Sequence, residues 1–226
     1  MIKKIPLKKI VEFRRKSDKR RKSFVQKLYN PKSSNESGGD YWIRSISAIN
    51  NAFRENDAKF IYDKLIETED LYNKSVRSQT RVMYKRNIEI LDNYTEFDFS
   101  IWRPSIDLKF LPKPKSKSLL EISELPIQIL PHQVFSFNVN EVQNIGGIWF
   151  VTWLEGFKNE DLGIYAESLF RYLSINYSEN FEINPSACKV IDVSAKNSVD
   201  FSMIIKGKIP SLIDTTIKSF SGYLNN

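Results

Sequence analysis

The sequence predicts an α+β fold, in which an N-terminal helical block precedes a mixed β-sheet domain with one long and one short helix. Two observations support this prediction. Residues 40–103 contain no glycine and no proline, and their apolar side chains recur at helical spacing. From Asp98 onward, apolar residues alternate with polar ones, which is typical of half-buried strands. We therefore expect a boundary near residue 96.

The first 30 residues are predicted to form a basic helical arm. Pro6 suits the first turn of a helix, and Ser17 or Asp18 can cap a second short helix. Two short helices around a polar turn match a helix-turn-helix in outline, although no glycine marks the turn. Residues 31–39 combine Pro, Ser, Asn and Gly in one run and are predicted to be a linker.

Residues 40–95 are predicted to contain three helices. Asp40, Asp57 and Ser75 can each cap one of them. Each helix carries an apolar stripe that we expect to face the core. The stripes consist of Trp42, Ile46, Ile49 and Phe53, then Phe60, Ile61 and Leu65, then Val76, Thr80, Met83, Asn87 and Ile90.

Residues 96–226 are predicted to form the sheet domain. Two alternating segments come first, followed by three further strands, a long helix over 158–177, two more strands and a short helix that opens at Pro210. The predicted strands contain Phe97, Phe99 and Ile101, then Ile106, Leu108 and Phe110, then residues 119–130, 133–139, 146–154, 188–193 and 199–205. Residues 140–144 are expected to connect a hairpin, with a bulge at Gly146 and Gly147.

The positive charge of the chain is concentrated at its beginning. The 226 residues carry 34 Lys and Arg against 27 Asp and Glu, a net charge of +7. Residues 1–30 hold twelve of these bases and two acids, a net +10, so the other 196 residues have a net charge of −3. A local excess of this size favours a partner with many negative charges, either a nucleic acid or an acidic protein. A solvated helix face remains the alternative.

Composition excludes several classes of protein. The chain is 41% hydrophobic and 27% charged, which is typical of a folded globular protein. No apolar run is long enough to span a bilayer, and the N-terminus lacks the features of a secretory signal. One cysteine and one histidine are too few for a disulfide framework or a structural zinc site. We therefore expect a cytoplasmic protein without a bound metal.

No sequence motif identifies a reaction. The sequence contains no GxSxG, Walker, GxGxxG or HExxH motif. His132 lies between a proline and a predicted strand, where it is expected to begin the strand rather than act as a base. Cys188 lies among strand formers and is expected to be a buried, unreactive thiol. We therefore lean against an enzyme.

A metal-dependent nuclease remains an alternative. Residues 119–193 order their predicted elements as strand, hairpin, helix and strand, which is similar in outline to the core of restriction-endonuclease-like nucleases. That resemblance implies an acid on one hairpin strand and a (D/E)xK triplet on the next, and neither is present on the matching strands. A DxK triplet exists instead at Asp107 to Lys109, nine residues after Asp98, and Glu121 and Glu124 follow. These residues could hold Mg²⁺ if the nuclease alternative holds, and a fold that has lost its ligands and only binds is equally open.

Aromatic and basic residues elsewhere offer two further candidate surfaces. If one face of the strand around residue 150 is exposed, Trp149 and Trp153 could stack on bases or form a partner interface. If both faces are covered, the strand is central in the sheet. The second surface is a basic stripe on the last helix of the helical block, formed by Arg77, Arg81 and Lys85.

The first hypothesis is therefore a nucleic-acid-binding protein that contacts phosphates through its basic arm. The phosphate contacts are assigned to Arg14, Arg15, Lys19, Arg20, Arg21 and Lys22, assisted by Arg77, Arg81 and Lys85. The partner is DNA or RNA, and no cofactor is expected. The alternatives are a subunit of a multi-protein bacterial system, whose arm docks on an acidic protein, and the Mg²⁺-dependent nuclease with Asp98, Asp107 and Lys109.

Overall fold

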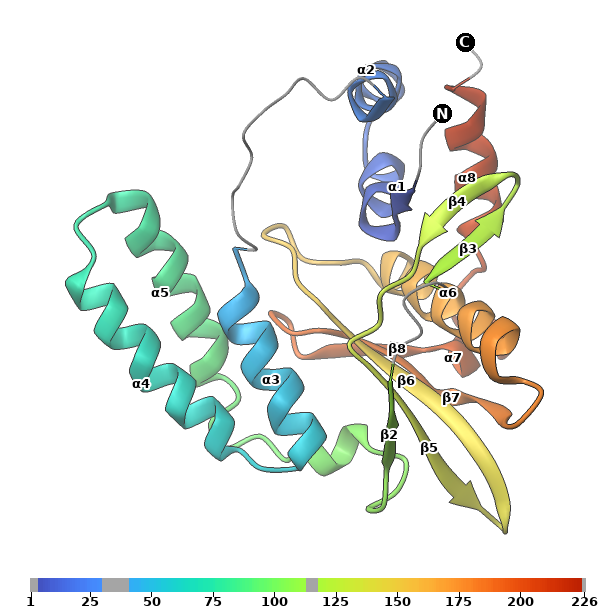
Figure 1. Ribbon diagram of the computed structural model, residues 1–226. Helices are drawn as coiled ribbons and strands as arrows, with labels where there is room; N and C mark the ends of the chain where they lie inside the picture. Colours follow the sequence, from blue (N-terminus) through green and yellow to red (C-terminus); the bar gives the residue numbers. More distant parts are fainter. Residues whose placement is uncertain (1–3, 30–40, 113–117, 225–226) are drawn as a thin grey trace.

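The computed structural model describes residues 4–29, 41–112 and 118–224. These residues form eight helices and two mixed sheets, which confirms the predicted α+β class (Figure 1). The helices are α1 (Leu7–Arg14), α2 (Asp18–Tyr29), α3 (Ile43–Glu55), α4 (Lys59–Lys74), α5 (Ser78–Asp92), α6 (Asn159–Tyr177), α7 (Phe201–Ile205) and α8 (Ile213–Gly222), with a 3₁₀ helix η1 (Phe99–Trp102). The strands are β1 (Ile5–Pro6), β2 (Lys109–Leu111), β3 (Leu119–Ile122), β4 (Leu125–Gln128), β5 (Gln133–Val139), β6 (Val142–Val151), β7 (Glu182–Asp192) and β8 (Asn197–Asp200).

The larger sheet has the strand order β2-β5-β6-β7-β8. The strands β6 and β7 are parallel, because α6 crosses over between them and returns the chain in the same direction. The smaller sheet has the order β1-β4-β3, and β1 joins it in parallel, with Ile5 opposite Ile127. The start of the chain is therefore part of a sheet whose other strands lie more than 110 residues later.

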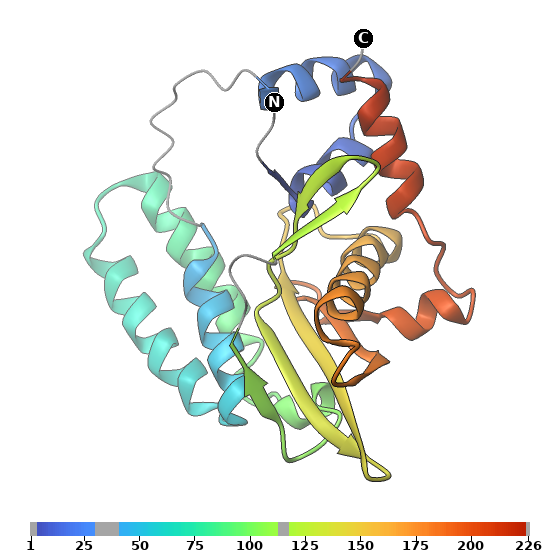
Figure 2. The ribbon, with the colours of Figure 1, turned by 45° about the vertical axis from the view of Figure 1, so that its right-hand side comes forward.

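The larger sheet is covered on both faces (Figures 1 and 2). On one face, Trp149 and Val151 pack in a core with α1, α6, α8 and the smaller sheet. On the other face, Ile148 and Phe150 pack in a core with α3, α4, α5 and η1. The strand β6 is therefore central and apolar on both sides, as one of the two sequence hypotheses predicted.

The basic arm packs on the sheet domain. The helix α1 buries Leu7, Ile10, Val11 and Phe13, and the Phe13 ring meets the Phe220 ring of α8 edge to face at 5.1 Å. The predicted division into arm, linker, helical block and sheet domain stays a prediction, and the linker over 31–39 lies outside the described residues.

The helical block is organised around one buried amide. The Asn87 carboxamide accepts hydrogen bonds from the Ser45 backbone N–H and hydroxyl, and donates to the carbonyls of Tyr41 and Met83. It therefore ties α5 to the start of α3. The N-cap of α4 is Ala58 rather than the predicted Asp57, although the Asp57 carboxylate, one residue earlier, accepts a hydrogen bond from the Lys59 N–H.

Two of the residues predicted to cap helices, Ser75 and Asp40, are not seen in that role. The helix α5 begins at Ser78, and Ser75 instead terminates α4, so its predicted role as a cap of α5 was wrong. The predicted cap Asp40 lies outside the described residues.

Three predicted strands were wrong in part. The alternating segment around Phe99 is the 3₁₀ helix η1, because the Asp98 carboxylate accepts a hydrogen bond from the Ser100 N–H and turns the chain. Residues 119–130 form two strands, β3 and β4, joined by a turn in which Ser123 and Glu124 both have positive φ. The segment 199–205 ends its strand at Asp200 and continues as α7. The sheet domain therefore has two short helices, α7 and α8, rather than one among the described residues.

The parallel strands approach each other very closely at Gly146. The pairing of β6 with β7 shifts register between Ile145 and Gly147, which confirms the predicted irregularity at the two glycines. A Cβ atom on Gly146 would lie 2.5 Å from the Ala187 Cβ and 2.8 Å from the Ala187 carbonyl oxygen. Because both neighbours belong to the backbone region of β7, the strands would have to separate to admit a side chain.

We predict that Gly146→Ala lowers the free energy of unfolding by about 1–3 kcal/mol, the usual penalty of overpacking a core. Urea denaturation followed by circular dichroism measures this change. The matched control is Gly222→Ala in α8, where a new Cβ meets no atom within 4 Å, and it should leave stability nearly unchanged. An unchanged midpoint for the Gly146 variant would contradict the close approach of β6 and β7.

Candidate functional site

The cations of the arm fall into two groups, of which the first makes internal contacts. The Arg14 guanidinium donates to the Asp161 carboxylate at 2.6 Å, and the Arg15 Nε lies 3.6 Å from the other oxygen of the same carboxylate. Asp161 is fully buried in the first turn of α6, where its carboxylate also accepts a hydrogen bond from the Lys158 N–H. A carboxylate in this position is favoured by the positive end of the helix dipole. Asp161 therefore holds the arm on the sheet domain.

Further contacts neutralise other cations of the first group. Arg21 pairs with Asp18 at 2.9 Å and donates to the Arg14 carbonyl oxygen. Lys9 and Lys16 both contact Glu12, at 2.9 and 3.3 Å. Burial alone would raise the pKa of Glu12, but the hydrogen bonds from the two lysines lower it overall. These cations consequently offer less charge to a partner than the sequence suggests.

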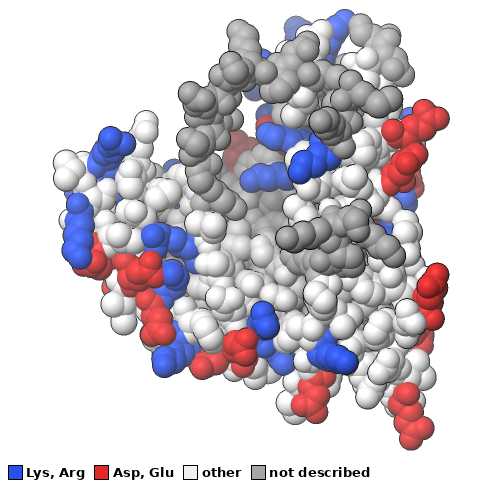
Figure 3. All heavy atoms as spheres, in the orientation of Figure 1, with Lys and Arg blue, Asp and Glu red and all other residues white. Residues whose placement is uncertain are grey.

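The second group lies on the outward face of α2. Its members are exposed, and their charged groups make no ion pair or hydrogen bond within the described ranges: Lys19, Arg20, Lys22 and Lys27. At 3.6 residues per turn they fall within an arc of about 160°, interleaved with the exposed Ser23 and Gln26. The opposite face of α2 carries Val25, which is buried, and Phe24 and Leu28, which pack against the same core. Lys and Arg atoms are visible at α2 in Figure 3.

Three of the six arm residues assigned to phosphates therefore face outward, and three make internal contacts. Lys19, Arg20 and Lys22 are available to a partner. Arg14, Arg15 and Arg21 are engaged in the ways described above. Lys27 completes the exposed group, although sequence analysis did not assign it a contact.

The second predicted basic stripe lies on α5, in a different part of the molecule from α2 (Figures 1 and 2). Arg77, Arg81 and Lys85 are all exposed. The Arg81 guanidinium lies 4.7 Å from the Tyr72 ring centroid, and Lys85 lies 4.0 Å from Glu89. Figure 3 shows acidic and basic side chains intermixed over this helical block, so its charge is balanced locally.

The two tryptophans proposed for a partner interface are both covered. Trp149 is 8% exposed and meets the Tyr165 ring edge to face at 5.1 Å. Trp153 is half-buried, with the Arg15 guanidinium 4.9 Å and the Lys8 Nζ 5.8 Å from its ring centroid. Trp149 therefore belongs to the core, and Trp153 serves as a cation-binding surface for the arm.

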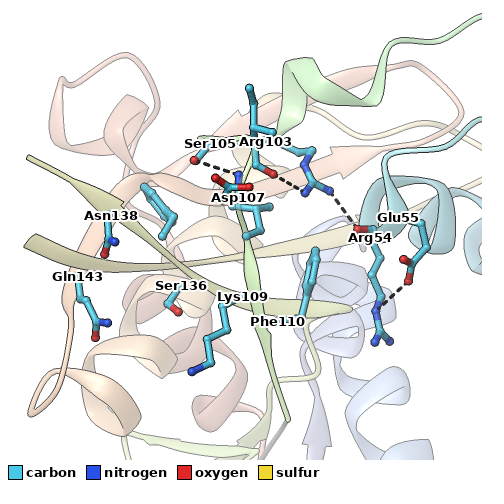
Figure 4. A pocket seen from close by; sticks show the side chains of 13 residues that line it. Arg54, Glu55, Arg103, Ser105, Asp107, Lys109, Phe110, Ser136, Asn138 and Gln143 are labelled. Atoms are coloured by element: carbon cyan, nitrogen blue, oxygen red, sulfur yellow. Dashed lines mark hydrogen bonds and ion pairs between the residues drawn. The ribbon is translucent and has the colours of Figure 1, made fainter. Parts of the chain in front are cut away.

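The structure separates the residues of the nuclease alternative. Asp107 and Lys109 line an open hollow of about 650 Å³ beside the edge strand β2, and their charged groups point away from each other (Figure 4). Asp98 caps η1, and its hydrogen bonds from Ser100 lower the pKa of its carboxyl. Glu121 belongs to β3, in the other sheet.

The described residues also contain no group of three or more His, Cys, Asp or Glu side chains that could hold a metal ion. The candidate triplet and its neighbours therefore do not converge on a Mg²⁺ site. Beside the hollow, the Arg103 guanidinium (Figure 4) instead donates to the carbonyl oxygens of Phe53, Arg54 and Ile106.

The single histidine and the single cysteine have structural positions. The His132 Nδ1 accepts a hydrogen bond from the Phe150 N–H at 3.1 Å, which fixes the ring at the start of β5. Cys188 is fully buried in β7, which confirms its predicted burial, and burial raises the pKa of its thiol.

A small cavity of about 190 Å³ lies where the arm, the helical block and the end of β6 meet. Thr152, immediately after β6, lines this cavity, and its buried hydroxyl has no hydrogen-bond partner among the residues described.

Sequence analysis missed both Thr152 and Asp161. An acid three residues after a helix cap is a recognisable capping signal, but no local pattern connects Asp161 with arginines some 147 residues earlier.

No family model matches this chain, and no significant match was found among curated proteins or solved structures. No helix in residues 4–29, 41–112 and 118–224 is long and apolar enough to cross a membrane.

We predict that Asp161→Asn lowers the free energy of unfolding by about 3 kcal/mol, since it leaves two arginines beside a buried site without their counter-charge. Urea denaturation measures the loss, and limited proteolysis should show cleavage within residues 14–22 as the arm detaches. The control is Glu160→Gln, which removes a neighbouring carboxylate that has no ion-pair partner in the described structure. Equal stability of both variants would contradict the role of Asp161.

Proposed function

We propose that the protein binds nucleic acid, and that the outward face of α2 contacts the phosphates. The observation that carries this proposal is a set of four exposed cations whose charged groups pair with no described residue: Lys19, Arg20, Lys22 and Lys27. An arc of one helix with four positive charges and no acid supports attraction to a polyanion.

The chemistry of this face suits a phosphate backbone. Ser23 and Gln26 lie between the cations and can donate hydrogen bonds to phosphate oxygens. Neutralising phosphates with Lys and Arg releases condensed counterions, so binding should weaken as salt is added. The contacts to phosphate carry no sequence information, so this face supports affinity rather than base specificity.

The alternative is a protein-interaction subunit of a multi-protein bacterial system. Several large apolar side chains of the helical block are exposed, including Ile66 at 66% and Val76 at 95%, and these favour a protein partner. An acidic protein could occupy the α2 face in the same way as a nucleic acid. The Mg²⁺-dependent nuclease is less favoured, because its candidate residues lie apart.

We further propose a cytoplasmic location, supported by the single buried cysteine.

We predict that the variant with Lys19, Arg20, Lys22 and Lys27 all replaced by Ser loses most of its affinity for labelled DNA and RNA. If all four cations contact phosphates of a duplex, the slope of log K against log salt is about −3.6, so affinity falls roughly 10²-fold between about 50 and 200 mM salt. Fluorescence anisotropy measures both quantities, and the variant should show weaker binding and a shallower slope.

The matched control replaces four exposed cations of the helical block by Ser: Lys74, Arg77, Arg81 and Lys85. Its binding should equal that of the native chain if the contact lies on α2. Loss of affinity in this control alone would move the interface to α5. Absence of binding by the native chain at the lower salt concentration would refute nucleic-acid binding and favour an acidic protein partner.

A further inference from the structure

The cavity beside Thr152 brings together segments that are far apart in the sequence. Its walls come from the start of α1, the first turn of α3, the connection from β4 to β5, the end of β6, and α6. Five aromatic residues line it: Trp42, Trp149, Phe150, Phe157 and Tyr165. An enclosure of this composition favours a flat, aromatic ligand.

The volume of the cavity limits the size of such a ligand. About 190 Å³ is less than the ~300–1,000 Å³ of sites that hold drug-sized molecules. The cavity can therefore admit one ring system and leave any larger substituent outside.

Two polar groups of the lining have hydrogen-bonding capacity to spare. Thr152 is 5% exposed, and its hydroxyl forms no hydrogen bond with any described residue. A buried hydroxyl without a partner has lost its hydrogen bonds to water, and a ligand that bonds to it would restore one. The Gln128 carboxamide also makes no hydrogen bond within the described part of the chain. A hydroxyl and a carboxamide can each donate and accept hydrogen bonds. They therefore match the edge of a heterocycle that carries both hydrogen-bond donors and acceptors.

A cation lies at the same cavity. Lys8 is exposed, lines the cavity, and makes no ion pair with any described residue. It belongs to α1, the helix that precedes the basic face of α2. A negatively charged substituent that remains outside the cavity would therefore meet positive charge.

From these features we infer that the cavity binds a single unstacked nucleobase, with Thr152 and Gln128 at its hydrogen-bonding edge. The inference rests on the proposed function in one respect only, because it makes the base part of a strand whose phosphates pass Lys8 towards α2. Base recognition by stacking on aromatic side chains and by hydrogen bonds to the base edge is the expected chemistry of such a pocket.

The test uses the full chain with uncharged nucleosides: adenosine, guanosine, cytidine and uridine. Trp42 and Trp149 line the cavity, so saturable quenching of tryptophan fluorescence reports binding, and calorimetry provides the affinity. Because nucleosides carry no phosphate, the variant without the four α2 cations should bind them as the native chain does. Failure of the proposed function would instead appear as strands that do not bind while nucleosides still do.

Two variants connect the binding to the cavity. Thr152→Val removes an unpartnered hydroxyl with little change of shape, so the fold should be retained and the affinity for at least one nucleoside should fall roughly threefold to tenfold. Leu130→Trp enlarges a side chain that lines the cavity and is 47% exposed, so it should fill the space and abolish binding. Ile66→Trp, on α4 and 66% exposed, is the control for an added tryptophan and should bind normally.

The results separate the possibilities. Saturable binding of a nucleoside that Leu130→Trp abolishes and Ile66→Trp preserves would support the inference. Binding of none of the four nucleosides up to millimolar concentration would overturn it, whether or not strands bind to α2. Binding of an apolar ring such as toluene in their place would also overturn it, since the polar groups would then have no role.

Discussion

The architecture depends on a strand that must be covered on both faces. The strand β6 places Trp149 and Val151 on one side and Ile148 and Phe150 on the other, and all four are buried. Neither face can be left to water without exposing a large apolar area. The crossover helix α6 covers one face because the parallel connection from β6 to β7 places it there. The other face is covered by α3, α4 and α5, which come from earlier in the chain.

The basic arm illustrates how a net charge can be misleading. Counting residues gives the arm a charge of +10, yet several of its cations are engaged in internal contacts. Arg14 and Arg15 surround the buried carboxylate of Asp161, and Arg15 also stacks on Trp153. The same residue type therefore has two roles in neighbouring turns. Arg14 and Arg15 hold the arm, whereas the exposed cations of α2 face water: Lys19, Arg20, Lys22 and Lys27.

Local periodicity was sufficient to predict most helices and the central strands. The stripe of α6 and the strands β5 and β6 were predicted within a few residues, because their patterns are long and regular. The segment around Phe99 was misread because one side-chain hydrogen bond, from the Ser100 N–H to Asp98, overrides a short alternation. The turn at Ser123 and Glu124 was missed because neither residue is a glycine, the usual marker of positive φ.

The candidate site was predictable only where it is local. The cations of α2 follow each other in the sequence, so their clustering could be predicted from spacing alone. The cavity at Thr152 could not be, because its walls come from five separate segments. The role of Asp161 could not be predicted either, because only the tertiary fold brings its carboxylate to the Arg14 guanidinium.

The pairing of the first strand has a consequence for how the protein is made. Ile5 pairs with Ile127, and Arg14 contacts a carboxylate 147 residues later in the chain. A ribosome adds about 5–20 residues per second, so roughly 7 to 30 seconds separate the synthesis of Arg14 from that of Asp161. Throughout that interval the arm lacks its counter-charge, and for most of it the arm also lacks its sheet partner β4. The arm is thus synthesised long before the residues on which it docks, and its cations face the surrounding solution until it docks.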